Sequence, residues 1–147
     1  MVFEDYDIEA AAKLCAAGKF RNAGQVCISP TRFFVQDSIH DRFLALFTEQ
    51  VEAVKVGNGL DEEVNMGPLV AERRIDIMDG FVSDAVSNGA ELLVGGSGIQ
   101  SPGSFFAPTL LQDVPDTARI MTEEPFGPIA PTARFASLDE VIDRANS

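Results

Sequence analysis

The segment "KFRNAGQVCISPTRF", residues 19–33, holds the side chains of this sequence that are best suited to chemistry. Cys27 follows the small and amide residues of "NAGQ", and Pro30 disfavours helix directly after it. The thiolate is the reactive form of a cysteine, and Arg21 and Arg32 would favour it. A cysteine is, however, more often a small buried hydrophobic residue than a nucleophile. The local pattern therefore leaves both roles open for Cys27.

The second thiol and the single histidine give weaker signals. Cys15 falls on the apolar face of a predicted helix, which favours a buried structural thiol. The two cysteines lie twelve positions apart, and the acidic N-terminus does not resemble a secretory signal, so we expect free thiols. His40 has no obvious partner, and no Cys/His cluster has metal-ligand spacing. We expect no metal site.

The composition excludes several classes of protein. The chain has 147 residues, of which 46% are hydrophobic, enough for one folded domain with its own core. No run of about 18 apolar residues is present, so no membrane segment is expected. A net charge of −12 disfavours binding to nucleic acid or to anionic lipid. We therefore expect a cytoplasmic protein with neither nucleic acid nor membrane as a partner.

Alternating helices and strands must position these side chains. Apolar periodicity predicts helices from Asp7 (N-cap) to Gly18, from Ser38 (N-cap) to about Val54, over residues 71–88, and after residue 137. Short strands are predicted within residues 31–36, 90–96, 105–114 and 131–135. Strands separated by helices favour right-handed crossovers, and thus a mostly parallel sheet flanked by helices in an α/β fold.

The predicted helices also indicate which residues form the core. Helical spacing of the apolar residues selects two buried stripes, one of Ile39, Phe43, Leu46, Phe47, Val51 and Val54, and one of Ile75, Met78, Val82, Ala85 and Val86. Glycine, asparagine and proline interrupt the periodicity over residues 56–70, which predicts a loop there.

Two motifs resemble those of one enzyme family. "GQVCISPTR", residues 24–32, resembles the catalytic-cysteine signature of the NAD(P)-dependent aldehyde dehydrogenase superfamily. "EEPFGPI", residues 123–129, resembles the cofactor-contacting stretch of that superfamily, at an appropriate spacing. "FEDYDIEAA", "MGPLV" and the stretch from residue 95 to 114 resemble the connecting segments, in the right order. The resemblance covers essentially the whole chain and implies that residues 1–147 are part of an aldehyde dehydrogenase catalytic domain.

The resemblance implies a role for three residues. Cys27 matches the nucleophile, which forms a thiohemiacetal with the aldehyde; hydride transfer to NAD or NADP then leaves a thioester that water hydrolyses. Glu124 matches the residue that hydrogen-bonds the nicotinamide ribose hydroxyls, and Phe126 matches the residue that packs near the nicotinamide. Without the resemblance, Glu124 would be interpreted as a solvated loop charge and Phe126 as a core anchor.

The resemblance also implies that much of the active site lies outside these residues. In the superfamily, the Rossmann-like domain that binds most of the NAD or NADP precedes this region. So do the asparagine that completes the oxyanion hole and the glutamate that activates water, while the oligomerisation segment follows. "VFEDYD" and "RANS" look like interrupted elements. We therefore expect a piece of a longer, homo-oligomeric protein that is inactive by itself.

The substrate prediction depends on Arg21. It lies six positions before Cys27 and resembles the arginine of the succinate-semialdehyde dehydrogenase branch that holds the distal carboxylate of the substrate. Alternatively, Arg21 pairs with one of 23 acidic residues at the surface. Some members of that branch carry a second cysteine two residues after the nucleophile and form a disulfide between the two. Ser29 stands at that position here, so this local disulfide cannot form.

Three interpretations of the function stay open at this stage. The first is oxidation of a small aldehyde, with succinic semialdehyde as the leading substrate. The second is the same reaction on another aldehyde. The third, from a different class, is a noncatalytic α/β module with a redox-sensitive thiol, or a protein-interaction domain.

Overall fold

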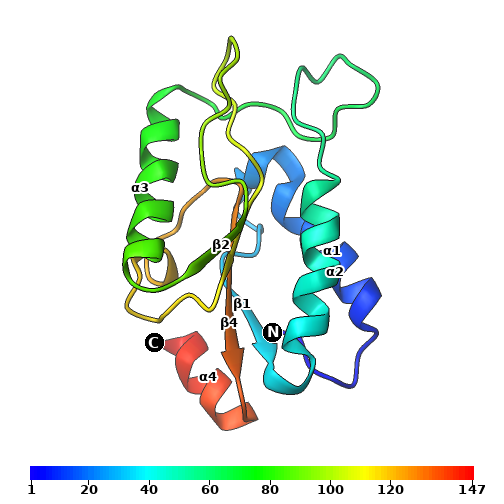
Figure 1. The fold of residues 1–147 in the computed structure, drawn as a ribbon, viewed down its shortest axis with the longest axis vertical. Helices are drawn as coiled ribbons and strands as arrows, with labels where there is room; N and C mark the ends of the chain where they lie inside the picture. Colours follow the sequence, from blue (N-terminus) through cyan, green and yellow to red (C-terminus); the bar gives the residue numbers. More distant parts are fainter.

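The computed structural model describes all 147 residues and contains one four-stranded sheet flanked by helices (Figure 1). The α-helices are α1 (Ile8–Phe20), α2 (His40–Glu52), α3 (Arg73–Ser87) and α4 (Leu138–Asn146). The strands are β1 (Phe33–Gln36), β2 (Glu91–Val94), β3 (Thr109–Gln112) and β4 (Ile129–Phe135). Short 3-10 turns lie at Arg21–Gly24, Asp37–Ile39 and Arg119–Met121. None of the helices is both long and apolar enough to span a membrane.

The sheet confirms the predicted α/β architecture, with one strand reversed. The strand order is β1-β4-β3-β2, and β4 pairs in parallel with both β1 and β3. The edge strand β2 pairs antiparallel with β3, because the segment that joins them contains no helix and cannot make a parallel crossover. The sheet is therefore mixed. Every residue of β4 except Arg134 is buried, as expected of a strand with a neighbour on each side.

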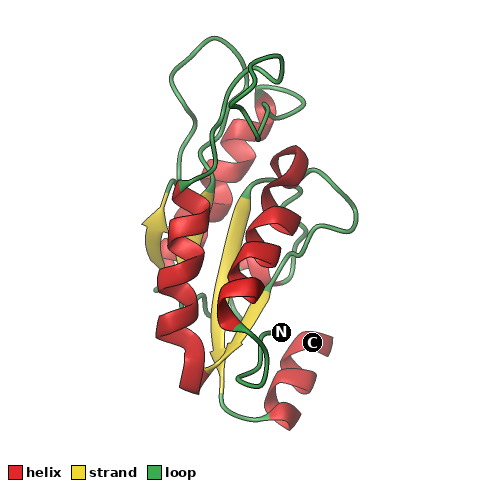
Figure 2. Ribbon diagram, turned by 90° about the vertical axis from the view of Figure 1, so that its right-hand side faces the viewer, coloured by secondary structure: helices red, strands yellow, loops and turns green.

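The helices form two layers around this sheet. Figure 1 shows α3 on one side of the strands and α1 with α2 on the other, and the turned view in Figure 2 shows the same arrangement. α4 follows β4 at the lower end of the molecule (Figure 1). One cluster of buried hydrophobic residues fills the space between the layers, and in it the Phe47 ring lies 5.3 Å, centroid to centroid, from the rings of Phe33 and Phe43.

The predicted core stripes follow the buried faces of α2 and α3, but Val54 and Ile75 are only half-buried and other positions also differ. On α2, Phe43, Phe47 and Val51 are buried as predicted, but Leu44 is buried where Leu46 is only half-buried. On α3, Met78, Val82 and Ala85 are buried, whereas Val86 is 44% exposed, contrary to prediction. The helical period therefore identified the correct face of each helix, but the stripes included residues at its edge and omitted the buried Leu44 and Phe81.

Two predicted helix boundaries are wrong. Asp7 is the N-cap of α1, as predicted, and its Oδ1 accepts from the Ala10 N–H at 3.0 Å. Gly18 does not end that helix, which continues to Phe20. Ser38 does not cap α2, because the 3-10 turn occupies that position and the Ser38 hydroxyl donates to Glu4 Oε2 at 2.7 Å instead.

His40, for which the sequence suggested no partner, lies beside two carboxylates and is within hydrogen-bond distance of only one of them. It is fully buried, with Nδ1 3.3 Å from Asp41 Oδ1 and Nε2 3.6 Å from Asp113 Oδ1. Arg134 bridges the same two carboxylates. This cluster follows β1, whereas Cys27 precedes it, so the two lie toward opposite ends of that strand.

Candidate active site

The Cys27 loop and the segment 123–127 meet because they lead into neighbouring parallel strands. β1 and β4 pair in register from Phe33 opposite Thr132, so the residues that precede the two strands lie at the same edge of the sheet. Cys27 and Glu124 line one cavity of about 630 Å³ there, together with Ser29, Thr31, Arg32 and neighbouring residues. The fold thus brings together two of the residues that the sequence singled out.

The two thiols differ in exposure. Cys27 is exposed and free, on a turn in which the Ser29 N–H donates to the Val26 carbonyl at 2.9 Å. The N–H of Cys27 makes no backbone hydrogen bond, so it remains available as a donor beside Sγ. Cys15 is free and half-buried against the core, and burial raises the pKa of its thiol. Cys15 is therefore poorly suited to form a thiolate.

Three consecutive residues with positive φ shape the start of the Cys27 loop. Asn22, Ala23 and Gly24 have φ of 51°, 53° and 70°. The Asn22 side chain donates to the Gln25 carbonyl at 3.1 Å, which supports this left-handed turn. A Cβ on Gly24 would lie 2.1 Å from the carbonyl oxygen of Gly127. Only glycine allows the two loops to approach this closely.

Gln25 fixes the same loop to a third segment. Its Oε1 accepts from the Val70 N–H at 2.9 Å, and its Nε2 donates to the Pro68 carbonyl at 3.3 Å. These bonds attach the Cys27 loop to the end of the long loop that precedes α3. Gln25 thus connects the two loops through its side chain, two residues before the thiol.

Arg74 holds the backbone of segment 123–127, and the sequence analysis did not select it. Its Nη2 donates to the carbonyls of Pro125 and Phe126, the latter at 3.2 Å. Phe126 has φ of 45° and is 36% exposed, so the core prediction made without the resemblance is wrong for this ring. One signal was available: Arg74 lies in the first turn of α3, where the helix dipole disfavours a cation unless it has another partner.

The two adjacent glutamates are in different situations. Arg119 forms a bidentate pair with Glu123, at 2.9 and 3.0 Å, and these hydrogen bonds lower the pKa of the Glu123 carboxyl. Glu124 lines the cavity, and its carboxylate makes no ion pair. Glu124 is therefore the free acceptor of the pair, and it lines the same cavity as Cys27.

Lys19 is a second residue that the sequence analysis missed. It lies in the last turn of α1 and is 1% exposed. Burial lowers the pKa of its ammonium to about 8, and the Glu124 charge opposes this change. Its backbone carbonyl accepts the Ser29 hydroxyl at 3.5 Å. A buried cation therefore lies beneath the Cys27 loop.

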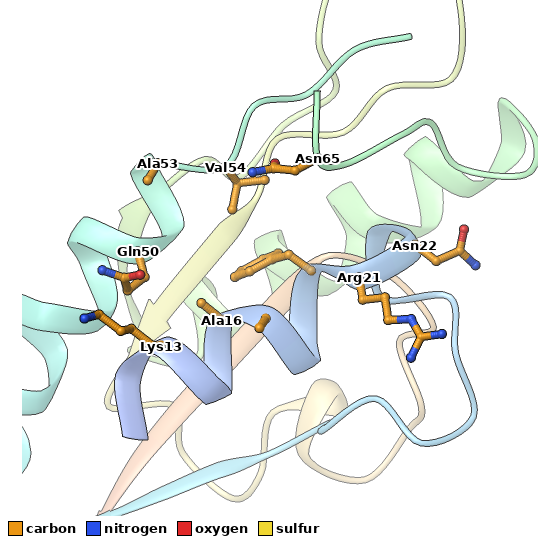
Figure 3. A pocket seen from close by; sticks show the side chains of 10 residues that line it. Lys13, Ala16, Arg21, Asn22, Gln50, Ala53, Val54 and Asn65 are labelled. Carbon is orange, nitrogen blue, oxygen red and sulfur yellow. The ribbon is translucent and has the colours of Figure 1, made fainter. Parts of the chain in front are cut away.

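The two arginines near Cys27 in sequence separate in space. Arg32 lines the Cys27 cavity, where its guanidinium donates to the carbonyls of Arg144 and Ala145 at 3.4 and 3.0 Å. Arg21 lines a different cavity, of about 450 Å³, between α1 and α2. Figure 3 shows Arg21 at the C-terminal end of α1, with Lys13 on the same helix and Gln50 on α2. The structure does not place Arg21 in the Cys27 cavity.

Arg21 also lacks the surface ion pair that was its alternative role. No acidic side chain lies within ion-pair distance of its guanidinium, and the side chain is exposed. The guanidinium therefore remains available to an anion from outside this chain.

The cavity suits part of a dinucleotide. A free carboxylate offers two acceptor oxygens for the vicinal hydroxyls of a ribose, and Glu124 supplies one beside the thiol. Phe126, two residues further along the same segment, has a ring that is 36% exposed and offers an apolar surface, while Arg74 holds its backbone carbonyl. The residues present thus fit the nicotinamide end of NAD or NADP.

Comparison with known proteins identifies the relatives of this chain. The sequence model of the aldehyde dehydrogenase family matches residues 1–147. The succinate-semialdehyde dehydrogenase (NADP+) GabD of Escherichia coli (strain K12) is 41% identical over 146 residues, 99% of this chain and 30% of that protein. A 3-sulfolactaldehyde dehydrogenase of Pseudomonas putida is 40% identical over 147 residues, all of this chain and 30% of that protein.

Solved structures agree with this result. The succinate-semialdehyde dehydrogenase of Burkholderia pseudomallei is 38% identical and superposes with a TM-score of 0.96, over 99% of this chain and 30% of that one. A 3,6-anhydro-L-galactose dehydrogenase in complex with NAP is 41% identical, with a TM-score of 0.95 over 99% of this chain and 31% of that one. The chain thus spans about 30% of the length of its relatives.

Proposed function

This chain belongs to the aldehyde dehydrogenase family, and from that premise we propose that the complete protein oxidises an aldehyde to a carboxylic acid with NAD or NADP, using Cys27 as its nucleophile. The observation that supports this proposal most is the shared cavity. An exposed thiol and a carboxylate without an ion-pair partner, far apart in the sequence, line one cavity where two loops meet. A noncatalytic module with a redox-sensitive thiol would not need Glu124 in the cavity of that thiol.

The proposed reaction begins at Sγ of Cys27. The thiolate adds to the carbonyl carbon of the aldehyde, a C–S bond forms, and the carbonyl π electrons move to oxygen. The free N–H of Cys27 donates a hydrogen bond to that oxyanion, one of the donors such an intermediate needs. When the carbonyl reforms, the former aldehyde C–H bond breaks with its electron pair. Water then attacks the resulting thioester, Cys27 leaves as the thiolate, and the carboxylic acid is released.

NAD or NADP, when bound, supplies the acceptor for the hydride that leaves in this step. Glu124 is proposed to accept hydrogen bonds from the ribose hydroxyls of the cofactor, and Phe126 to pack near its nicotinamide. Such positioning matters because an oriented reaction needs its reacting atoms held about 3–3.5 Å apart before the chemical step. We propose that the rest of the cofactor site, the oxyanion-hole asparagine and the water-activating glutamate belong to other parts of the complete protein.

Succinic semialdehyde is the proposed substrate, with Arg21 binding its distal carboxylate. Arg21 has no acidic partner in this chain, and several relatives are named for this activity, although Arg21 lines a different cavity from Cys27 in this chain. Another aldehyde is the alternative, because equally similar relatives are named for 3-sulfolactaldehyde and for 3,6-anhydro-alpha-L-galactose. A cytoplasmic location, expected from the composition, and a homo-oligomeric state, implied by the resemblance, stay predictions.

Exchange of the two cysteines in the complete protein tests the nucleophile. Cys27→Ser is expected to lower single-turnover hydride transfer on the order of 10³-fold or more, because an alcohol has no thiolate form at neutral pH. Cofactor affinity should be nearly unchanged. Cys15→Ser is the matched control and should retain the rate. Full activity of Cys27→Ser with loss in Cys15→Ser would overturn the assignment.

A further inference from the structure

Two arginine side chains lie over one phenylalanine ring beside the Cys27 cavity. The guanidinium carbons of Arg32 and Arg144 lie 5.8 and 5.1 Å from the centre of the Phe34 ring. That ring is buried and belongs to β1, the strand into which the Cys27 loop leads. Two cations close to one ring repel each other, so each guanidinium needs acceptors of its own to offset the repulsion.

Arg32 finds its acceptors at the C-terminal end of α4. Its Nη1 donates to the Arg144 carbonyl at 3.4 Å, and its Nη2 donates to the Ala145 carbonyl at 3.0 Å. The last carbonyls of a helix have no partner within the helix, and a cation beside them also interacts favourably with the helix dipole. Ser147, the residue directly after α4, lines the cavity of Cys27. Arg32 thus fixes the end of α4 at the wall of that cavity.

Arg144 connects the same helix to a second part of the cavity wall. Its Nε and Nη2 form a bidentate pair with the Asp116 carboxylate, at 2.8 and 2.9 Å. Asp116 lies three residues before the turn at Arg119–Met121, which leads into the segment that holds Glu124. Residues 120–124 all line the cavity. α4 is therefore bonded to the Cys27 loop on one side and to the start of this segment on the other.

The sequence suggested a different role for Arg32, in which its charge favours the thiolate of Cys27. In the structure both terminal nitrogens of the guanidinium donate to carbonyls of α4, at the end of the helix that carries a partial negative charge. These carbonyl dipoles offset part of the positive charge that would act on Cys27. The two roles also need different chemistry, because a thiolate needs only a nearby cation, whereas two adjacent carbonyls need a planar fork.

We propose that Arg32 is a positioning residue that joins the Cys27 loop to the end of α4. Arg144 and Asp116 continue this connection to the segment that holds Glu124. The network thereby fixes the position of the thiol relative to the carboxylate. The inference rests on the proposed function, in which Cys27 attacks the aldehyde and Glu124 binds the cofactor.

The test uses Arg32→Lys in the complete protein, because lysine keeps the charge and loses the fork. Single-turnover hydride transfer at saturating cofactor is expected to fall on the order of 10- to 10²-fold, the effect of a misplacement of up to about 1 Å. The pH midpoint for alkylation of Cys27 by iodoacetamide should not change, since the charge remains. Arg42→Lys, at an exposed position of α2, is the matched control and should keep the parent rate.

A double-variant cycle tests the connection through α4. Asp116→Asn should lower the same rate several-fold, and adding it to Arg32→Lys should lower the rate little further, because both changes break one connection. Losses that multiply in the double variant would refute the connection.

The remaining outcomes separate the inference from the proposed function. If Arg32→Lys reacts at the parent rate while Arg32→Gln raises the pH midpoint of alkylation, Arg32 acts through its charge and the positioning role is refuted. If Cys27→Ser keeps hydride transfer, the proposed function itself fails, whatever the Arg32 variants do. Unfolding curves measure the folded fraction of each variant. A purely structural role would shift those curves and leave the rate per folded molecule unchanged, which would also refute the inference.

Discussion

Replacing Gly24 with alanine tests whether the contact between the Cys27 loop and segment 123–127 sets the geometry of the site. The added Cβ would lie 2.1 Å from the Gly127 carbonyl oxygen, whereas ordinary contact begins at 3.4 Å, so the loops must separate by more than 1 Å. A misplacement of about 1 Å can lower the rate of an oriented reaction about 10²-fold. Left-handed φ at an alanine adds about 1–2 kcal/mol of strain. We expect both effects in Gly24→Ala.

Gly89→Ala is the matched control. Gly89 also has positive φ, 106°, but a Cβ there meets no atom within 4 Å, so the variant carries backbone strain without the clash. The assay is single-turnover NAD(P)H formation in the complete protein, with thermal unfolding in parallel. Both variants should lose stability, and only Gly24→Ala should lose about two orders of magnitude in rate. If the two variants react at the same rate, the contact between the loops does not position Cys27 and Glu124.

Three further predictions concern charged residues of the complete protein. Arg21→Ala should lose roughly 2–5 kcal/mol of transition-state stabilisation on succinic semialdehyde, which is at least about 30-fold in kcat/KM, and should lose little on an uncharged aldehyde of similar length. Arg21→Lys should recover only part of this loss. An equal loss on both substrates would refute the carboxylate role. Glu124→Gln should slow single-turnover hydride transfer because the hydrogen bonds to the ribose hydroxyls are weakened and the nicotinamide is positioned less precisely. An unchanged rate would mean that Glu124 is an ordinary charged residue of the loop. Arg74→Ala should raise the KM for cofactor several-fold, because it releases the carbonyls of Pro125 and Phe126. That size corresponds roughly to the loss of two charge-assisted hydrogen bonds to partly exposed acceptors. The control is the rate at which iodoacetamide alkylates Cys27, which should be the same in the variant and the parent.

Local rules predicted the elements of the fold but not every direction or boundary. Three of the four strands lie within the predicted segments, β4 begins two residues before its segment, and Asp7 caps α1 as its position before the apolar pattern indicated. The reversal of β2 was missed because a mostly parallel sheet was inferred from the overall alternation of helices and strands. Residues 95–108, which join β2 to β3, carry no helical pattern, and such a connection leaves two neighbouring strands antiparallel. Ser38 was misplaced because a competing partner, Glu4, lies far away in the sequence.

The candidate site could be predicted only in part for the same reason. The resemblance selected Cys27 and Glu124, and the parallel pairing of β1 and β4 explains why they share a cavity. Nothing in the sequence analysis distinguished Lys19 from an exposed lysine at the end of a helix, because the burial of its side chain is set by tertiary packing. Roles set by long-range contacts cannot be read from a short window of sequence.

The burial of Lys19 also has a thermodynamic consequence for the whole domain. The unfolded chain binds a proton at this amine up to its ordinary pKa of 10.5, whereas the folded chain releases it at about 8, a difference worth about 3 kcal/mol. Since the unfolded state binds more protons between these two values, the free energy of unfolding rises with pH over that window, and below pH 8 the full penalty is present. At neutral pH the fold therefore carries a cation that weakens it. A chain selected for stability alone would place an apolar side chain at this position.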